Sequence, residues 1–277
     1  MDKIRFILVV LSSLFFVKGQ AFNGEMTEEI YRADTTREEA MEKEAERKQD
    51  ENREKEEKER YYTERTINFD LGFSNYLYKG KFPDATDELF TLNPLGSSNF
   101  AIASNNNSHI VGPLFLDWGG SLSWYQFKFQ DPGMRIVKDA DQVYFFQDTS
   151  GYTKYRKSMF KATYLNAYMV PMFYVGKVRR SKGFKGWSHG HGDGGFRFGA
   201  GPYAGYRLMS KAKLFFVEDK RQVIKDRGNF YLNNFRYGIR GQVGWNSVDV
   251  YFNYDLNTLF ERGRGPELNT FSFGIIF

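Results

Sequence analysis

The chain has 277 residues, 41% of them hydrophobic, a formal net charge of +5 and no cysteine. The lack of cysteine excludes disulfides, thiol catalysis, cysteine metal sites and lipid attachment through a thiol. Aromatic residues make up 18% of the chain, and 27 glycines accompany them. Abundant glycine and aromatic side chains together favour a protein built from many strands.

The first 21 residues have the pattern of a secretory signal peptide. Lys3 and Arg5 form a basic start, an apolar stretch continues to Val17, and Gly19-Gln20-Ala21 has the small-x-small form of a cleavage site. The alternative is a single membrane anchor, but the apolar run is shorter than the roughly 20 residues that a spanning helix needs. We therefore expect an exported protein, in which any later membrane crossing uses strands.

Residues 22–65 predict a charged helical arm in the periplasm. Between residues 28 and 65 there are 15 acidic and 10 basic residues and neither glycine nor proline. Pairs such as Glu44–Lys48 and Glu51–Lys55 have the i,i+4 spacing that supports an exposed helix. The few apolar residues make no heptad seam, so a coiled coil is not expected. The segment is either a solvated helix or a docking arm that binds an envelope partner through residues 28–62.

Charge divides the chain into an acidic arm and a basic body. Residues 28–65 sum to −5, whereas residues 66–277 sum to +9. A basic body fits contact with the anionic outer-membrane lipid and with lipopolysaccharide. Nucleic acid is not an expected partner of an exported chain.

From Thr66 onward, apolar and polar residues alternate in eight separate stretches, a pattern that predicts strands with two different faces. The stretches are residues 67–75, 97–104, 114–125, 163–175, 196–208, 234–245, 248–256 and 269–277. Several reach the length of about 9–11 residues with which a tilted strand crosses a bilayer. Most connections alternate between long and short, as in outer-membrane barrels. Residues 105–112, which contain His109, are expected to be a short turn.

Residues 66–277 therefore predict an all-β fold: a closed, antiparallel transmembrane β-barrel of about eight strands. A barrel of ten strands is the alternative, with residues 141–147 and 212–218 as the additional strands. Those two segments could instead extend neighbouring strands above the membrane.

Large aromatic side chains fall on the apolar faces of these strands, where they could form girdles at the lipid boundary. They are Trp118, Trp124, Tyr206, Trp245 and Tyr254. The alternative for each of them is a place in a soluble core. The final stretch puts four more apolar side chains on one face, namely Phe271, Phe273, Ile275 and Phe277.

Four stretches together resemble the Bacteroidota outer-membrane β-barrel family related to PorT. They are 67-INFDLGFSNYL-77, 113-PLFLDWGGSLSWYQFKFQDP-132, 228-GNFYLNNFRYGIRGQVGW-245 and 249-DVYFNYDLNTLF-260. The resemblance covers residues 66–277 and implies the barrel fold and an outer-membrane location. It also implies that barrel-insertion machinery recognises the aromatic final strand. It implies hardly any biochemical activity.

The polar faces of the predicted strands carry four acids and four arginines. They are Asp70, Asp117, Asp249 and Asp255, together with Arg197, Arg207, Arg236 and Arg240. An eight-stranded barrel is only wide enough to be filled by its own side chains. Arginine–carboxylate pairs would satisfy these charges away from water, so we expect a closed polar plug. A gated ion path is the alternative.

His189, His191 and Asp193 form the one weak metal-binding candidate, because they lie close together in a glycine-rich loop. We expect no metal, no cofactor and no catalytic residues. The expected function is a non-enzymatic outer-membrane anchor or accessory subunit of an envelope complex, with secretion-related complexes among the candidates. A small gated channel and a lipid-modifying enzyme are the alternatives.

Overall fold

The computed structural model describes residues 40–53, 63–84, 89–149, 151, 154–176, 183–184, 195–245 and 248–277. The chain divides into two compact units, Met1–Glu59 and Arg60–Phe277. The expected signal peptide and most of the charged arm lie outside the described residues. No described helix has the length and apolar character needed to span a membrane.

In the first unit, residues 40–53 form a helix that is exposed at every position. Its charged side chains pair along the helix: Lys48 Nζ lies 2.8 Å from Glu44 Oε1, and Arg47 Nε lies 3.7 Å from Glu51 Oε1. Exposed pairs of this kind contribute about 0.3–0.5 kcal/mol each. Local pairing therefore supports this helix, since its residues have no buried face.

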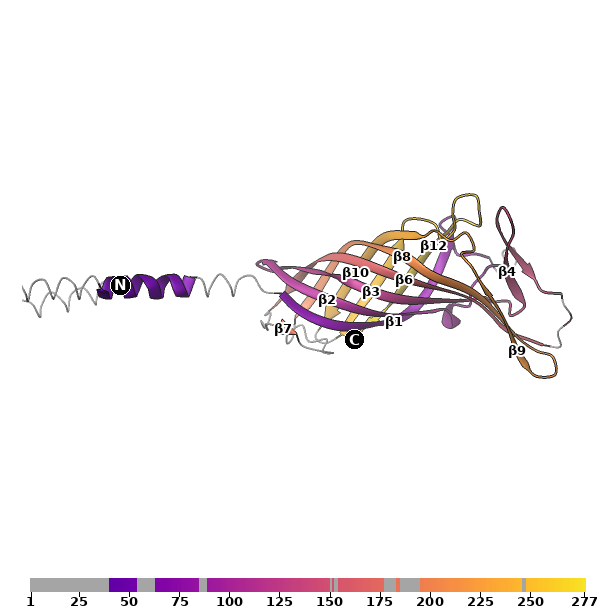
Figure 1. The fold of residues 1–277 in the computed structure, drawn as a ribbon, viewed down its shortest axis with the longest axis horizontal. Helices are drawn as coiled ribbons and strands as arrows, with labels where there is room; N and C mark the ends of the chain where they lie inside the picture. Colours follow the sequence, from indigo (N-terminus) through magenta and orange to yellow (C-terminus); the bar gives the residue numbers. More distant parts are fainter. Residues whose placement is uncertain are drawn as a thin grey trace, which may run out of the picture. The chain divides into compact units, whose positions relative to one another are not determined.

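The second unit is one large sheet in which eight strands close into a ring (Figure 1). These strands are β1 (Thr63–Tyr78), β2 (Ser98–Val111), β3 (Leu114–Lys128), β6 (Lys154–Val175), β8 (Phe196–Val217), β10 (Phe235–Trp245), β11 (Val248–Asp255) and β12 (Leu268–Ile276). Each is antiparallel to both of its neighbours, and the ring closes where β12 pairs with β1 and β10 pairs with β8. All eight predicted strands are thus confirmed.

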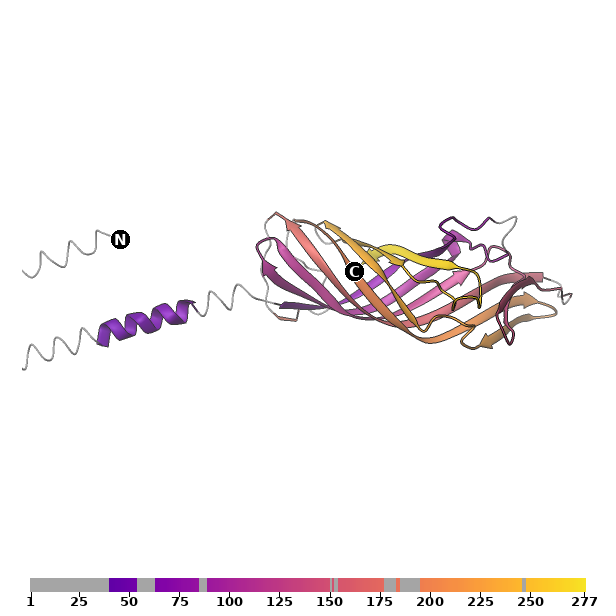
Figure 2. The same cartoon turned by 90° about the horizontal axis from the view of Figure 1, so that it is seen from above.

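The ten-stranded alternative is wrong. β4 (Met134–Lys138) and β5 (Val143–Gln147) pair only with each other, in a separate hairpin. Residues 212–217 belong to β8, which runs beyond the ring together with β6 and pairs there with β9 (Arg221–Arg227), as Figures 1 and 2 show. The short β7 (Gly183–Phe184) pairs in parallel with the start of β1.

The predicted turn at residues 105–112 is also wrong over most of its length. β2 continues to Val111, so that the connection to β3 is only Gly112 and Pro113. Asn105 and Asn107 are buried on the inner face, where they bond to Tyr168 and Asp117. The mostly polar residues 105–111 resemble a turn in the sequence. They form a strand because the polar side chains that point inward find hydrogen-bond partners there.

Strand connections differ strongly between the two ends of the ring. The short-turn end holds the β2–β3 turn, the start of β1 and the end of β12, the end of β10 and the start of β11, and the end of β6 and the start of β8. The long-loop end holds the described residues 79–84, 89–97, 129–149, 151, 218–234 and 256–267. Apart from the β6–β8 connection, this is the alternation that the sequence predicts.

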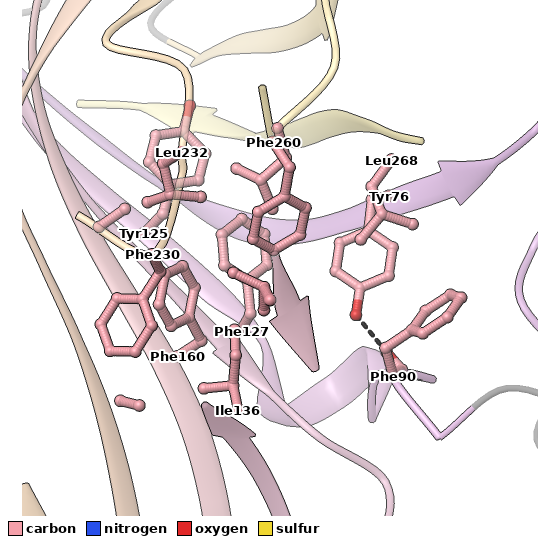
Figure 3. Packing of buried hydrophobic residues seen from close by; sticks show 14 of the residues in the cluster. Tyr76, Phe90, Tyr125, Phe127, Ile136, Phe160, Phe230, Leu232, Phe260 and Leu268 are labelled. Carbon is pink, nitrogen blue, oxygen red and sulfur yellow. Dashed lines mark hydrogen bonds between the residues drawn. The ribbon is translucent and has the colours of Figure 1, made fainter. Parts of the chain in front are cut away.

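An apolar cluster fills the interior toward the long-loop end, and the loops contribute to it (Figure 3). Phe127 and Phe160 from β3 and β6 meet Phe230, Leu232 and Phe260 from the loops, all buried. The loops are linked by backbone hydrogen bonds, such as Val143 N to Arg264 O at 2.8 Å. The η1 turn (Pro94–Gly96) and the β4–β5 hairpin complete this end.

Candidate functional site

The interior toward the short-turn end holds three arginine–aspartate pairs, beside a second, smaller group of buried apolar side chains that includes Phe115, Val170 and Met172. Arg236 Nη2 is 2.9 Å from Asp255 Oδ1, Arg240 Nη2 is 2.9 Å from Asp70 Oδ2, and Arg197 Nη2 is 2.6 Å from Asp249 Oδ1. All six residues are at most 8% exposed. They project inward because strand alternation sends every second side chain to the inner face.

Arg236 lies in a cage of tyrosines at the boundary with the apolar cluster. Its guanidinium carbon lies 4.5 Å from the ring centre of Tyr125, 4.8 Å from Tyr164 and 5.2 Å from Tyr203. Its Nη2 donates to Tyr203 Oη at 3.0 Å, and Nε and Nη2 both donate to Asp255. A planar guanidinium suits this setting, since it can stack on aromatic faces and donate in its own plane.

Arg240 occupies the middle of the polar interior and links strands that are not adjacent. Its Asp70 partner comes from β1, across β11 and β12. The rings of Tyr168 and Tyr251 lie 5.1 Å and 4.8 Å from its guanidinium carbon. A cavity of about 20 Å³ beside Arg240 is lined by Asp70, Asn99, Tyr168 and further polar side chains. That volume holds about one water molecule, so the interior is filled here.

The Arg197–Asp249 pair, which lies nearest the short-turn end, depends on Gly244. An added Cβ at Gly244 would lie 1.8 Å from Asp249 Oδ1 and 2.5 Å from Arg197 Nε. Only a residue without a side chain leaves room for this pair. Nearby, Asn107 Nδ2 donates to Asp117 Oδ1 and also to Tyr174 Oη, the latter at 3.0 Å.

Arg207 differs from the other three arginines. It is half-buried, and its guanidinium donates to Ser210 Oγ at 3.2 Å and to Asn234 Oδ1 at 2.5 Å. Strand register puts it on the inner face as expected, opposite Tyr164 of β6. Its hydrogen-bond partners are neutral because it lies where β8 leaves the ring, beyond the paired charges.

Burial determines what the ion pairs do for this fold. A buried pair seldom stabilises a protein more than apolar side chains of the same volume would, but loss of one partner costs about 3–5 kcal/mol. The Arg240–Asp70 and Arg197–Asp249 pairs therefore link strands that are not neighbours, β10 with β1 and β8 with β11, whereas Arg236–Asp255 links the neighbours β10 and β11. The three pairs also fill the space through which a solute would have to pass.

The outer wall of the ring is apolar and exposed on every strand. One residue from each strand illustrates this: Leu71, Ile102, Trp118, Leu165, Phe198, Ile239, Val250 and Phe273 are 40% to 54% exposed. We call this surface the apolar belt. A water-soluble protein rarely exposes apolar side chains so extensively.

The predicted boundary aromatics all project outward from the ring. Trp118, Trp124, Tyr206 and Trp245 are exposed, and Tyr254 is partly exposed. Trp245 lies beside the β10–β11 turn, whereas Tyr206 packs on Phe235 near the long-loop end. In the final strand, Phe271, Phe273, Ile275 and Phe277 share the outer face, where Phe73 lies opposite Phe273.

The histidines give no metal centre within the described part of the chain. His109 lies in β2 and not in a turn, and its Nε2 lies 3.0 Å from the Gly112 carbonyl oxygen. Among the described residues, no group of three metal-ligating side chains lies together. His189, His191 and Asp193 are outside the described residues.

Several interior residues were not among the predicted site residues. Asn99 donates to Tyr251 Oη at 2.6 Å, and Asn107 holds Asp117. The loop residues Phe230, Leu232 and Phe260 close the apolar end. The alternation in 97–104 pointed to Asn99, but no short-range pattern marks single apolar residues in long loops as parts of a core.

Comparison with known proteins adds no identification, because no protein-family model, curated protein or solved structure matches the chain.

Proposed function

We propose that residues 66–277 form an outer-membrane β-barrel with a closed interior, which serves as a non-enzymatic anchor or accessory subunit of an envelope complex. The observation that carries the proposal is the arrangement of the two faces of the ring. Charged side chains are buried and paired inside, while apolar side chains are exposed outside on all eight strands. This is the arrangement that a lipid environment requires.

The filled interior favours an anchor over a channel. The tyrosine-caged Arg236 and the Arg240–Asp70 pair lie across the polar part of the ring, and the apolar cluster lies across the rest. A conducting state would need these buried pairs to separate, at a cost of several kcal/mol for each uncompensated charge. The proposed barrel therefore conducts no ions at rest.

The charged arm supplies the proposed docking element. Its described helix exposes every residue, and its acidic and basic side chains alternate along the surface. The chain enters β1 at the short-turn end, which in outer-membrane barrels faces the periplasm. We accordingly assign residues 28–62 to the periplasm, where a partner subunit would bind them. The resemblance to the PorT-related family is part of the same proposal.

The test is a pull-down of the tagged protein from its own outer membrane in mild detergent, with and without residues 28–62. We expect defined partner proteins that are lost when the arm is deleted. Recovery of the protein alone in both cases would refute the subunit role. Planar-bilayer recordings accompany this test: steady conductance of the unmodified protein would instead favour the channel, and an increase with Arg236→Ala would assign the conductance to this interior.

A further inference from the structure

A cluster of cations lies on the outer face of the sheet where β6, β8 and β9 extend beyond the ring. We call it the lysine patch. Its members are Lys128, Lys157, Lys161, Lys211, Lys213, Lys225 and Arg227. The alternate residues on the opposite face, among them Phe160, Ala212 and Leu214, are buried. Strand alternation therefore directs the cations of the patch away from the protein core.

Strand register brings like charges directly opposite one another in this patch. Lys211 is paired with Lys161 on one side and with Arg227 on the other. Two residues farther from the ring and on the same face, Lys213 is paired with Lys225. Like charges at directly opposed positions destabilise a sheet. The chain therefore keeps an unfavourable arrangement at three cross-strand pairs, two in one row and one in the next.

No carboxylate compensates these charges in the part of the chain that the structure describes. Asp226, the nearest acid along β9, lies on the other face and pairs with Arg135 Nη2 at 3.7 Å. The pKa of Lys161 is lowered by burial and then by Lys213, Lys211 and Lys157. The pKa of Lys213 is lowered by burial and then by Lys211 and Lys225. Burial is the larger cause for both lysines, and the neighbouring cations lower each pKa further.

The patch borders the apolar belt. On the same face, the row that adjoins Lys161 and Lys211 on the side of the ring consists of Trp124, Thr163 and Met209. Trp124 is 37% exposed and Met209 is 55% exposed. A ligand that touched both surfaces would need anionic groups beside an apolar body. Neighbouring strands are about 4.8 Å apart, so the row from Lys161 through Lys211 to Arg227 spans roughly 10 Å. That width fits more than one phosphate.

We propose that the lysine patch binds the headgroup of a glycolipid that carries several phosphates, namely lipopolysaccharide of the outer leaflet. The inference rests on the proposed membrane insertion, in which the long-loop end faces outward. Phosphate groups supply the counter-charges that the sheet lacks, through charge-assisted hydrogen bonds to lysine and arginine. The acyl chains of the same lipid lie against Trp124 and Met209.

The test compares two variants of the full-length protein in detergent micelles. The patch variant carries Lys161→Gln, Lys211→Gln and Lys213→Gln. The control variant carries Lys79→Gln, Lys81→Gln and Lys220→Gln, which removes the same charge from exposed positions outside the patch. Affinity is measured for purified lipopolysaccharide, for phosphatidylglycerol and for inorganic phosphate, and circular dichroism checks that both variants keep the strand content of the parent.

We expect the patch variant to lose about tenfold or more in lipopolysaccharide affinity, equivalent to about 1.4 kcal/mol, and the control variant to change less than threefold. Phosphatidylglycerol and inorganic phosphate should bind much more weakly than lipopolysaccharide. Equal losses in the two variants, or no loss in the patch variant, would overturn the proposal. Equally tight binding of phosphatidylglycerol would overturn the choice of glycolipid.

Reconstitution into vesicles separates this inference from the function on which it rests. If the parent protein and the patch variant both insert but bind lipopolysaccharide equally, only the lysine patch proposal fails. If the parent protein does not insert into vesicles, the membrane function itself fails.

Discussion

The two halves of the ring interior are lined by the same strands but are held together by different interactions. Along β1, the inward residues near the short-turn end include the buried Asn68 and Asp70, whereas Tyr76 lies in the apolar cluster. Along β3, Asp117 is followed by Tyr125 and Phe127 on the same face. The polar half combines directional ion pairs with the small apolar group around Phe115, Val170 and Met172, and the apolar half depends on packing against loops. A closed ring of strands can thus be filled by ion pairs beside a small apolar group in one half and by a larger apolar cluster in the other.

The largest expected effect is in the polar half. Arg236→Met leaves the buried Asp255 without its guanidinium partner. We expect the free energy of unfolding in micelles to fall by about 3–5 kcal/mol. Urea titration followed by tryptophan fluorescence would measure it.

The double variant Arg236→Met/Asp255→Leu serves as the test of mechanism. It should recover most of the loss, because no charge remains buried without a partner. Arg207→Met is the matched control, since Arg207 bonds only to neutral partners and is half-buried. An equal loss in the Arg207 variant would mean that charge pairing is not the cause.

The apolar half should respond to volume. Leu232 is fully buried in the loop-lined cluster. We expect Leu232→Ala to lower the free energy of unfolding by about 2–4 kcal/mol, through lost burial and the cavity that remains. Leu95→Ala is the control, because Leu95 is 85% exposed. A negligible effect at Leu232 would show that the loops do not form part of the core.

A third change tests the space around one ion pair. Gly244→Ala places a Cβ against Asp249 and Arg197. We expect a loss of about 1–3 kcal/mol, typical of overpacking. Gly241→Ala is the matched control in the same strand, since the atom nearest its added Cβ is 3.9 Å away. Similar losses at the two positions would attribute the effect to the loss of strand glycines in general.

The smallest expected effect lies outside both halves, in the lysine patch. Without lipid, Lys213→Gln should raise the free energy of unfolding at neutral pH by about 0.2–1 kcal/mol, since it removes opposed like charges. Because the pKa of Lys213 is lower in the folded protein than in the unfolded chain, the folded protein loses this proton at a lower pH than the unfolded chain does. Stability of the parent protein should therefore rise as the pH increases from the lowered pKa toward the ordinary value of 10.5.

Titration of urea unfolding against pH would measure this rise in the parent and in the Lys213→Gln variant. The variant should show a smaller rise. A parent protein whose stability falls over the same interval would contradict the expected repulsion.

Much of the ring could be predicted from sequence because each strand carries its own signal. Period-two alternation places Asp70, Arg236 and Arg240 on inner faces without any knowledge of their partners. The pairing itself could not be predicted, since Arg240 and Asp70 meet only through ring closure, 170 positions apart. The β2 end was misjudged because a run of polar residues resembles a turn until its inward partners are known.

The loop contributions were the least predictable part. The hairpin of β4 and β5 has a local pattern, in which the buried Met134 and Ile136 alternate with the partly exposed Arg135 and Val137. That pattern does not reveal that the hairpin packs over the ring. Phe230, Leu232 and Phe260 lie in loops outside the strands, where Leu232 and Phe260 form an isolated β-bridge. Their burial depends on the tertiary arrangement of several connections.

Site-directed spin labelling tests the central claim most directly, because the chain has no cysteine of its own. Single cysteines at Ile239 and Val250 probe the apolar belt, and Leu95 in a loop is the control. In lipid vesicles, labels at Ile239 and Val250 should collide with dissolved oxygen and be shielded from a water-soluble nickel complex, with the reverse at Leu95. Labels at Ile239 and Val250 that collide freely with the nickel complex would contradict membrane insertion.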